Sequence, residues 1–344
     1  MSEDAANPVR PPRRPRYRGK NPRRFEEKYK EHDPARYAET VAKVLASGKT
    51  PAGSHRPIMV AEVLEALAPQ PGEIAVDCTL GYGGHAQEIL TRVQPGGRLL
   101  GLDVDPIELP RTEERLRSLG YGPEQFTAWR SNFAGLPQVL VKAKLAGADL
   151  ILADLGVSSM QLDDPARGFS IKQDGPLDMR MNPARGQSAA LLLQKNAQAN
   201  LARLLEENAD EPRADFLAAV LAGKAFPNTL ALASAVRSAL VRLPNEEKEV
   251  SVRRVFQALR IAVNEEFSAL ETFLRQLPLC LNPGGRIAIL TFHSGEDRRV
   301  KKSFAAGAEF YSEISREVIR PSAAERNANP RSTSAKLRWA RRAA

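Results

Sequence analysis

The sequence predicts an α/β fold in which helices flank a parallel sheet and an all-helical subdomain interrupts the alternation. Short apolar segments of strand length recur along the chain, with amphipathic helical segments between them. From residue 188 to about residue 243, by contrast, the pattern is helical throughout, which predicts the insertion. The chain has 344 residues, of which 42% are hydrophobic, so it can form one large domain with such an insertion.

A glycine-rich turn follows the first predicted strand, residues 74–77. Gly81, Gly83 and Gly84 lie in this turn, and a helical segment begins directly after them. Residues without a Cβ allow a backbone to turn tightly and to approach a ligand closely. The unpaired N–H groups at the start of the helix suit a carboxylate or phosphate. The turn is therefore a candidate ligand-binding loop.

An acid stands at the end of the first, second and fourth predicted strands. These acids are Asp77, Asp103 and Asp154, and Asp103 lies where a ribose-binding carboxylate is expected. Ligands of parallel sheets bind outside the carboxyl ends of the strands, so the three acids are expected to share one site. Asp77 and Asp154 favour S-adenosylmethionine as the ligand, with Asp77 near its amino group. A nicotinamide cofactor, or a turn without a ligand, would also suit the glycine pattern alone.

The other predicted elements follow in order along the chain. A third strand leads to an aromatic residue, Phe133, that could lie against an adenine ring or belong to the core. A long polar loop over residues 161–181 mixes glycine, proline and charged residues, which is typical of lids and binding surfaces. The remaining predicted strands are residues 99–103, 126–129, 150–153, 286–292, 310–314 and 336–340. The predicted helices include residues 61–67, 189–208, 213–225, 229–243 and a long one spanning 252–277.

Charge and composition limit the classes of partner. The net charge of +9 makes a polyanionic partner plausible. Arginine and proline alternate within residues 1–50, so this stretch is expected to be a disordered basic extension. It would serve either as an arm that grips phosphates or as a solubilising tail. The two cysteines form no C-x-x-C pair, which argues against a disulfide framework or a zinc site.

The same composition gives an expectation about location. No apolar run reaches the ~18 residues of a membrane-spanning helix, and no apolar stretch follows the N-terminal positive charges. We therefore expect a cytoplasmic protein with no membrane partner.

Ordered motifs on different predicted elements then point to a family. They are GYGGH at 81–85, DLGVSS at 154–159, RGFS at 167–170, LDMRM at 177–181, FQALRIAVN at 256–264, FHS at 292–294, and NPRS at 329–332 with SAKLR at 334–338. Together they resemble the RsmH (MraW) family of bacterial methyltransferases, which modify the N4 amino group of a cytidine in 16S (small-subunit) ribosomal RNA. The resemblance covers roughly residues 55–338 and leaves out the basic extension.

The resemblance implies a class I (Rossmann-like) S-adenosylmethionine-dependent methyltransferase with a helical insertion. It implies four segments: the extension at 1–50, a first methyltransferase part at 51–161, the substrate-side insertion at 162–249, and a second methyltransferase part at 250–344. The implied partner is 16S ribosomal RNA, within the small ribosomal subunit, and a homodimer is one possible state. The cofactor-binding residues implied are Gly83, Gly84 and His85 at the methionine end, Asp103 at the ribose, Phe133 at the adenine, and Asp154 and Gln161.

Asp154 is the residue expected to be catalytic. An exocyclic amine of cytosine is a poor nucleophile because its lone pair is delocalised into the ring. An acceptor held against its N–H groups favours the nucleophilic form and stabilises the positive charge that develops on nitrogen. Many amino-methyltransferases have Pro-Pro-aromatic after this position, whereas here a Leu-Gly-Val run follows. Its role thus stays open between gripping the cofactor and contacting the base.

Candidate substrate-binding residues lie in the later motifs. His293 is a candidate proton acceptor, although a structural histidine, or a metal ligand beside Glu296 and Asp297, would fit the same pattern. Phe169 would stack on an unpaired base or pack within a lid. We expect no metal. The full substrate-side set is Arg167, Phe169, Asp178, Arg180, His293 and Lys336.

Departures from the family pattern concern the substrate side more than the cofactor. Asn-Ala-Asp-Glu at 208–211 stands where the family has Tyr-Gly-Glu-Glu, and residues 251–255 differ from its usual Pro-Ala-Thr-Arg. Gly295 replaces a leucine and Thr333 an arginine, while Pro110 is expected to break the helix after residue 106. A ribosome-assembly factor that has kept the fold but lost turnover is the alternative, against which the intact cofactor motifs argue.

Overall fold

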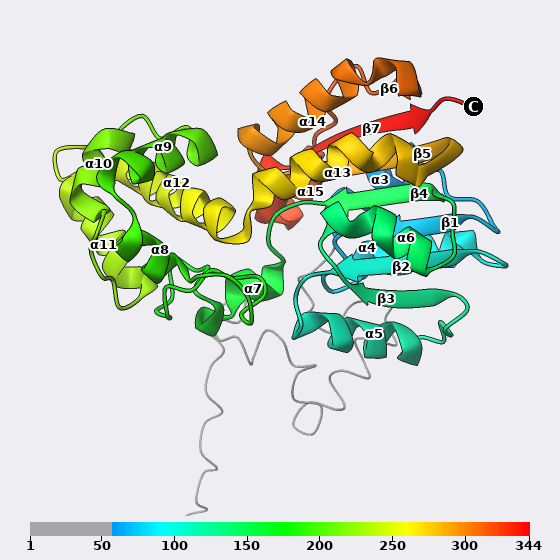
Figure 1. The fold of residues 1–344 in the computed structure, drawn as a ribbon, viewed down its shortest axis with the longest axis horizontal. Helices are drawn as coiled ribbons and strands as arrows, with labels where there is room; N and C mark the ends of the chain where they lie inside the picture. Colours follow the sequence, from blue (N-terminus) through cyan, green and yellow to red (C-terminus); the bar gives the residue numbers. More distant parts are fainter. Residues whose placement is uncertain (1–56) are drawn as a thin grey trace, which may run out of the picture. The chain divides into compact units, whose positions relative to one another are not determined.

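The computed structural model describes residues 57–344, which lie within a compact unit running from His55 to Ala344. The predicted basic extension at 1–50 lies outside the described residues. In the described part, a seven-stranded sheet has the order β3-β2-β1-β4-β5-β7-β6 (Figure 1). The strands are β1 Ile74–Asp77, β2 Arg98–Asp103, β3 Phe126–Arg130, β4 Ala148–Asp154, β5 Leu281–Thr291, β6 Tyr311–Ile314 and β7 Lys336–Arg342.

Five strands of this sheet are parallel. β1 pairs with β2 on one side and with β4 on the other, and β4 pairs in turn with β5. Strand β7 is antiparallel to both β5 and β6. The chain thus runs outward from β1 through β2 to β3, and then returns to place β4 on the other side of β1. This reversal of strand order lies at the carboxyl ends of β1 and β4, where ligands of such sheets bind, and we call this end of the sheet the crevice.

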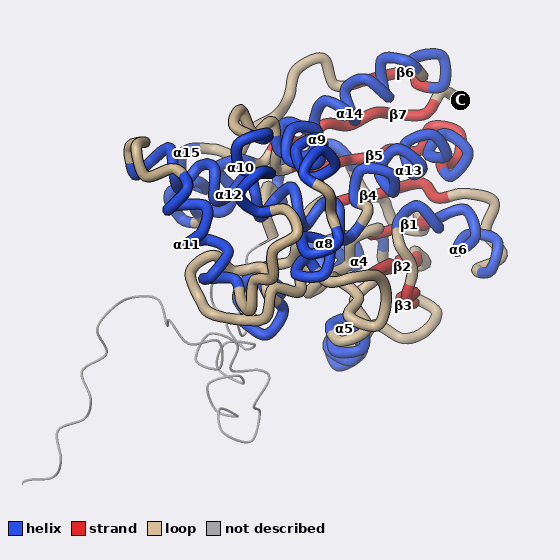
Figure 2. The backbone as a smooth tube through the Cα atoms, turned by 60° about the vertical axis from the view of Figure 1, so that its left-hand side comes forward, coloured by secondary structure: helices blue, strands red, loops and turns tan. Residues whose placement is uncertain are grey.

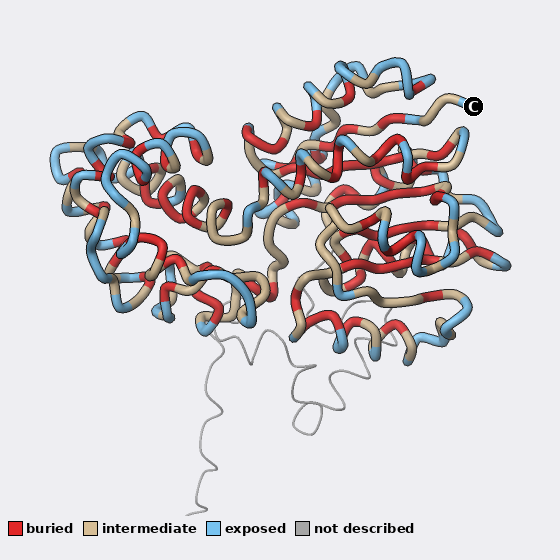
Figure 3. Tube along the Cα trace, viewed as in Figure 1, coloured by how far each residue is buried: buried red, intermediate tan, exposed pale blue. Residues whose placement is uncertain are grey.

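Successive residues of each strand serve opposite faces of the sheet. Leu150 and Leu152 of β4 pack in one core with helices α3 Val60–Leu67, α4 Gly84–Val93 and α5 Glu108–Ser118. Ile151 and Ala153 pack in the other core. There they meet helices α6 Leu136–Lys142, α13 Glu266–Cys280 and α14 Ser294–Ala306. The strands are therefore buried on both faces, which explains their near-continuous apolar sequences (Figure 3).

Pro110 does not break a helix, contrary to the prediction. Helix α5 begins at Glu108 and runs through Pro110 to Ser118. The proline lies in the first turn, where a backbone N–H has no partner within the helix, so its missing donor costs little.

The insertion between β4 and β5 contains helices that form a core of their own. They are α8 Ala189–Lys195, α9 Gln198–Ala209, α10 Ala214–Leu221, α11 Thr229–Ala239 and α12 Asn245–Asn264 (Figures 1 and 2). Apolar residues from all of these helices pack together with Phe169, Leu177 and Met179 of the preceding loop. The predicted boundary at residues 249–250 falls inside α12.

Two helices predicted as continuous are each divided. The segment 189–208 breaks at Asn196, whose side chain donates to the carbonyl of Leu192 (3.1 Å) and so competes with the helical pattern. The segment 252–277 breaks at Glu265, which adopts left-handed backbone angles, φ 52° and ψ 37°. Helix α12 then serves the insertion and α13 serves the sheet. The apolar spacing continues across both breaks, which is why the sequence did not reveal them.

The described part is completed by shorter helical segments around the sheet edge. They include α7 Ser159–Asp163, α15 Ala323–Ala328 and the 3₁₀ turns Phe133–Gly135, Pro165–Arg167, Ala308–Phe310 and Pro330–Ser334. Within residues 57–344, we find no helix with the length and apolar character needed to cross a membrane.

Candidate active site

The ends of β1 and β4 are tied together by Thr79. The backbone N–H of Asp154 donates to the Thr79 hydroxyl oxygen (2.7 Å), and the Thr79 N–H donates to Asp77 Oδ1 (3.1 Å). Sequence reasoning missed Thr79, which lies one residue outside the glycine loop. Its hydroxyl fixes where the acid of β4 stands relative to the acid of β1, so it sets the geometry of the crevice.

The glycine loop is held against the end of β2. The N–H of Gly81 donates to Asp103 Oδ2 (2.8 Å), and Asp103 Oδ1 accepts from the N–H of Asp105 (2.9 Å). Gly83 has φ 76° and precedes the first turn of α4. A Cβ on Gly83 would lie only 2.9 Å from Thr112 Cγ2, so both space and backbone angle require glycine there. The structure thus brings the predicted cofactor loop and Asp103 together.

Asp154 and His85 face each other inside the crevice. Asp154 Oδ2 lies 3.7 Å from His85 Nε2, and His85 is buried. Neither His85 Nε2 nor Asp154 Oδ1 has a hydrogen-bond partner among residues 57–344. Burial lowers the pKa of His85 to about 4, so this imidazole is neutral at pH 7. Two polar groups are therefore buried at the crevice with unused hydrogen-bonding capacity, as a ligand site requires.

The carboxylates of the crevice favour a cationic ligand. Burial, with the nearby charge of Asp103, raises the pKa of Asp77 to about 7. Burial, with the charges of Asp77 and Glu296, raises the pKa of Asp154 to about 8. A positive group between them would relieve both the burial and the mutual repulsion. S-adenosylmethionine carries an ammonium group and a sulfonium, so the residues present fit this cofactor.

His293 and Glu296 approach the same crevice from the start of α14. His293 Nδ1 accepts from the N–H of Glu296 (3.4 Å), while His293 Nε2 lies 3.3 Å from Glu296 Oε1. The other carboxylate oxygen of Glu296 accepts from the N–H of Phe292 (2.8 Å). Glu296 is close enough to Asp154 to raise its pKa. His293 therefore caps α14 and also lies at the edge of the sheet where Asp154 stands.

Gln161 and Arg167 converge on Asp105, a residue that sequence reasoning did not select. Asp105 Oδ2 accepts from Gln161 Nε2 (2.9 Å) and from Arg167 Nη1 (2.8 Å), and all three residues are buried. Gln161 Oε1 accepts from the N–H of Ser158 (3.0 Å). Both ends of the Gln161 amide thus have protein partners, and the cofactor-binding role of this residue stays a prediction. An acid before proline at a strand-to-helix turn was the available signal for Asp105.

The two predicted aromatic contacts lie in different cores. Phe133 is partly buried beyond the end of β3, edge-on to Phe273 with 5.5 Å between ring centroids. The contact of Phe133 with adenine stays a prediction. Phe169 is buried within the core of the insertion. Its stacking on a base also stays a prediction, and would require the loop to open.

The remaining substrate-side candidates are paired within the protein. Arg180 holds Asp178 through two hydrogen bonds of 2.7 Å, and Asp178 remains about one-quarter exposed. Lys336 Nζ donates to Asp297 Oδ2 (3.1 Å), and Arg338 donates to the other oxygen of Asp297. Arg180 and Asp178 neutralise each other, whereas Lys336 and Arg338 share one carboxylate and keep a net positive charge that an RNA phosphate could meet.

Two departures from the family pattern meet in the structure. The Ser251 hydroxyl donates to Glu211 Oε1 (3.2 Å), and Arg254 Nη1 lies 4.0 Å from Glu211 Oε2. Gln257 Nε2 donates to the carbonyl of Asn208 (3.1 Å). The segments 208–211 and 251–255 are therefore in contact, where the end of α9 meets α12.

Comparison with known proteins agrees with this geometry. A model of the "MraW methylase family" matches residues 52–343. A relative in Lachnoclostridium phytofermentans named "Ribosomal RNA small subunit methyltransferase H 1" is 51% identical and covers 95% of this chain and 92% of its own. One in Alkaliphilus metalliredigens named "Ribosomal RNA small subunit methyltransferase H 2" is 50% identical, covering 95% and 97%. The chain therefore belongs to the MraW methylase family and is an S-adenosylmethionine-dependent methyltransferase, as its motifs predicted.

Proposed function

We propose that this enzyme methylates the N4 amino group of a cytidine in 16S ribosomal RNA, acting in the cytoplasm on the small ribosomal subunit. The names of its relatives support the ribosomal RNA substrate. The structural observation that supports amine chemistry is Asp154, which stands at the end of β4 with Oδ1 unpaired among the described residues.

Asp154 is proposed to hold an N–H group of the target amine. When bound, S-adenosylmethionine supplies the methyl group. The N4–carbon bond forms as the sulfur–carbon bond breaks, and the bond's electron pair stays on sulfur. Asp154 stabilises the positive charge on N4. By aligning the amine, it also removes much of the entropic cost of bringing N4 and the methyl group into reacting geometry. The positive charge of the cofactor favours the ionised form of Asp154, although burial raises the pKa of the free protein's group to about 8.

The proton lost from N4 requires an acceptor, and two residues are placed for this role. Asp154 itself is one. His293 is the other, because it lies beside Glu296, whose charge reaches Asp154. We propose that Asp154 takes the proton directly and that His293 helps to orient the base.

The test is transfer of a tritiated methyl group to small ribosomal subunits that lack the modification. We expect the wild-type protein to label the RNA, and Asp154→Ala to lower kcat by about 100-fold or more, as for loss of a group that stabilises transition-state charge. Equal melting temperatures and circular dichroism spectra of the two proteins provide the control for folding. Tight binding of S-adenosylhomocysteine by a wild-type protein that labels neither subunits nor free RNA would contradict the proposal and favour an assembly factor.

A further inference from the structure

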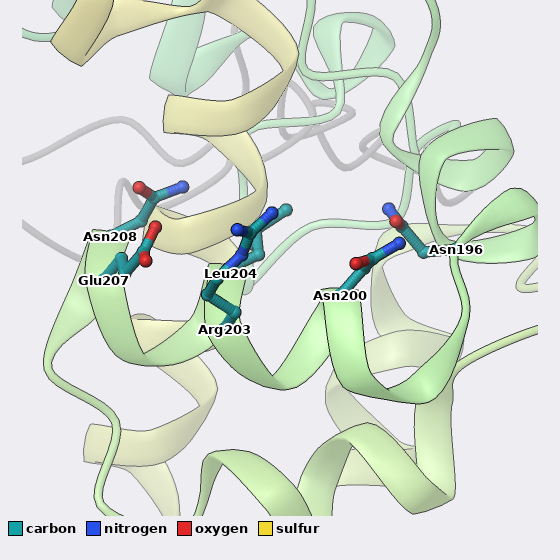
Figure 4. Close-up of a pocket in the computed structure, with 6 residues that line it drawn as sticks. All are labelled: Asn196, Asn200, Arg203, Leu204, Glu207 and Asn208. Atoms are coloured by element: carbon teal, nitrogen blue, oxygen red, sulfur yellow. The ribbon is translucent and has the colours of Figure 1, made fainter.

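A polar hollow lies on the insertion, apart from the crevice. It has a volume of about 330 Å³ and is lined along one side of α9 and by Asn196, two residues before this helix (Figure 4). Only Leu204 among the lining residues is apolar. The lining residues are Asn196, Asn200, Arg203, Leu204, Glu207 and Asn208.

Asn196 and Asn208 donate to backbone carbonyls of the fold, but three other side chains in this hollow are not used by it. Asn200, Arg203 and Glu207 are exposed, and their side chains have no hydrogen-bond or ion-pair partner within residues 57–344. They recur three and four residues apart, so they lie on one face of α9. Figure 4 shows them rising from the same side of the helix, with Asn196 directed toward Asn200. The opposite face of α9 carries buried residues of the insertion core. This packing anchors the helix, so the spacing of the polar side chains is fixed.

The chemistry of the hollow suits the edge of a nucleobase. Arg203 offers only donors, Glu207 only acceptors, and the asparagines offer both. A base edge also presents donors beside acceptors. A phosphate only accepts hydrogen bonds, and the charge of Glu207 would repel it. An apolar ligand would leave these polar groups unpaired.

The end of α9 contacts the start of α14, the helix that His293 caps. Asn208 lines the hollow, and two residues later Asp210 accepts from Ser294 Oγ (3.0 Å) and Arg298 Nη2 (2.9 Å) of α14. Ser294 directly follows His293. An RNA strand whose target cytidine lies at Asp154 could therefore continue past α14 and along α9, a helix ~18 Å long at ~1.5 Å per residue.

We propose that this hollow binds an unpaired nucleobase of the substrate RNA near the target cytidine, with Arg203 and Glu207 reading its edge. This inference rests on the proposed function and adds a specificity site to it. Sequence-specific recognition of RNA commonly uses unpaired bases, whose edges are free to accept such contacts.

The experiment measures steady-state methyl transfer to small subunits by the full chain and by Arg203→Ala and Glu207→Gln. We expect each variant to raise KM for the subunit by about tenfold, equivalent to about 1.4 kcal/mol, with kcat within about twofold, because these contacts act on binding rather than chemistry. Matched controls are Glu206→Gln, on the same helix but outside the hollow, and the exposed Arg242→Ala. Melting temperature and S-adenosylhomocysteine affinity should not change in any variant.

The outcomes separate the two proposals. Wild-type transfer with an unchanged KM in both variants would overturn only the nucleobase site. A raised KM for Arg203→Ala with an unchanged or lowered KM for Glu207→Gln would overturn it in favour of a phosphate contact. No transfer by the wild-type protein would overturn the proposed function, and this inference with it.

Discussion

At the scale of single residues, three acids at neighbouring strand ends explain the preference of the crevice for a cation. Asp77 and Asp154 are joined through Thr79, and Asp103 is joined to the glycine loop through Gly81. Burial raises the pKa of each acid, and the charge of a neighbouring acid adds to the rise: Asp103 for Asp77, Asp105 for Asp103, and Asp77 with Glu296 for Asp154. An ammonium group bound among them lowers those values again, so proton release and cofactor binding are linked.

This linkage gives a pH dependence with a defined sign. Asp77 and Asp154 have folded-state pKa values of about 7 and about 8, above the ordinary value of an aspartate. Since the folded protein holds these protons more tightly than the unfolded chain, this contribution to the free energy of unfolding falls as the pH rises from about 4 to about 8. A cationic ligand prefers the ionised acids. We therefore expect S-adenosylmethionine affinity to rise between about pH 6 and about pH 8, by up to tenfold per pH unit for each acid that must lose its proton.

Isothermal titration at both pH values measures this change and the protons released. Asp154→Asn should reduce the rise, because one of the two titrating groups is absent. The same affinity at both pH values in the wild-type protein would contradict the account of the crevice.

The residue scale also shows what sequence alone could predict of the site. Asp103 and Asp154 were predictable because each directly ends an apolar strand. Thr79 and Asp105 were missed, because their roles depend on contacts with residues 75 and 56 positions away, although Asp105 stands before a proline at a strand-to-helix turn. The partners of Gln161 and the burial of Phe169 also depend on such distant contacts, which one-dimensional spacing does not encode.

At the scale of elements, the turn between β1 and α4 requires glycine for two separable reasons. Gly83 and Gly120 both have left-handed backbone angles, φ 76° and φ 96°. A Cβ on Gly83 would collide with Thr112, whereas a Cβ on Gly120 would meet nothing within 4 Å. We expect Gly120→Ala to lower the free energy of unfolding by about 1–2 kcal/mol from backbone strain alone. Gly83→Ala should cost more and should weaken S-adenosylhomocysteine binding, which denaturant unfolding and titration would measure.

Comparing the two variants separates the effect of close packing at Gly83 from that of the backbone strain, which both positions share. Gly120→Ala is the matched control, since it lies on the turn after α5 and should leave cofactor affinity unchanged. If both variants lowered the free energy of unfolding equally and kept normal S-adenosylhomocysteine affinity, close packing at Gly83 would have no role.

The same scale explains why the elements were predicted better than their ends. Strands β1 to β4 lie where apolar runs predicted them, because a parallel sheet covered on both faces requires such runs. The breaks at Asn196 and Glu265 were missed because apolar residues continue at helical spacing on both sides. Glu265 divides a helix of the insertion from a helix of the sheet, and only the tertiary arrangement distinguishes their two environments.

At the scale of the whole described unit, the insertion and the sheet have separate cores. Leu205 of α9 is fully buried in the core of the insertion, and Leu100 of β2 is fully buried in a core of the sheet. Each Leu→Ala change should cost about 2–5 kcal/mol. We expect Leu205→Ala to speed hydrogen exchange in α8 to α12 while leaving S-adenosylhomocysteine affinity intact, and Leu100→Ala to weaken that affinity. Faster exchange throughout the sheet of Leu205→Ala would contradict this independence.

We propose that the sheet supplies the methyl-transfer chemistry and that the insertion presents the RNA. Mass analysis of the nucleosides released from small subunits that the enzyme has methylated in vitro measures the product directly. We expect a single new product, N4-methylcytidine, which is absent when Asp154→Ala replaces the wild-type protein. A methyl group on a ring carbon, on a ribose oxygen or on another base would contradict the assignment of Asp154 to an exocyclic amine.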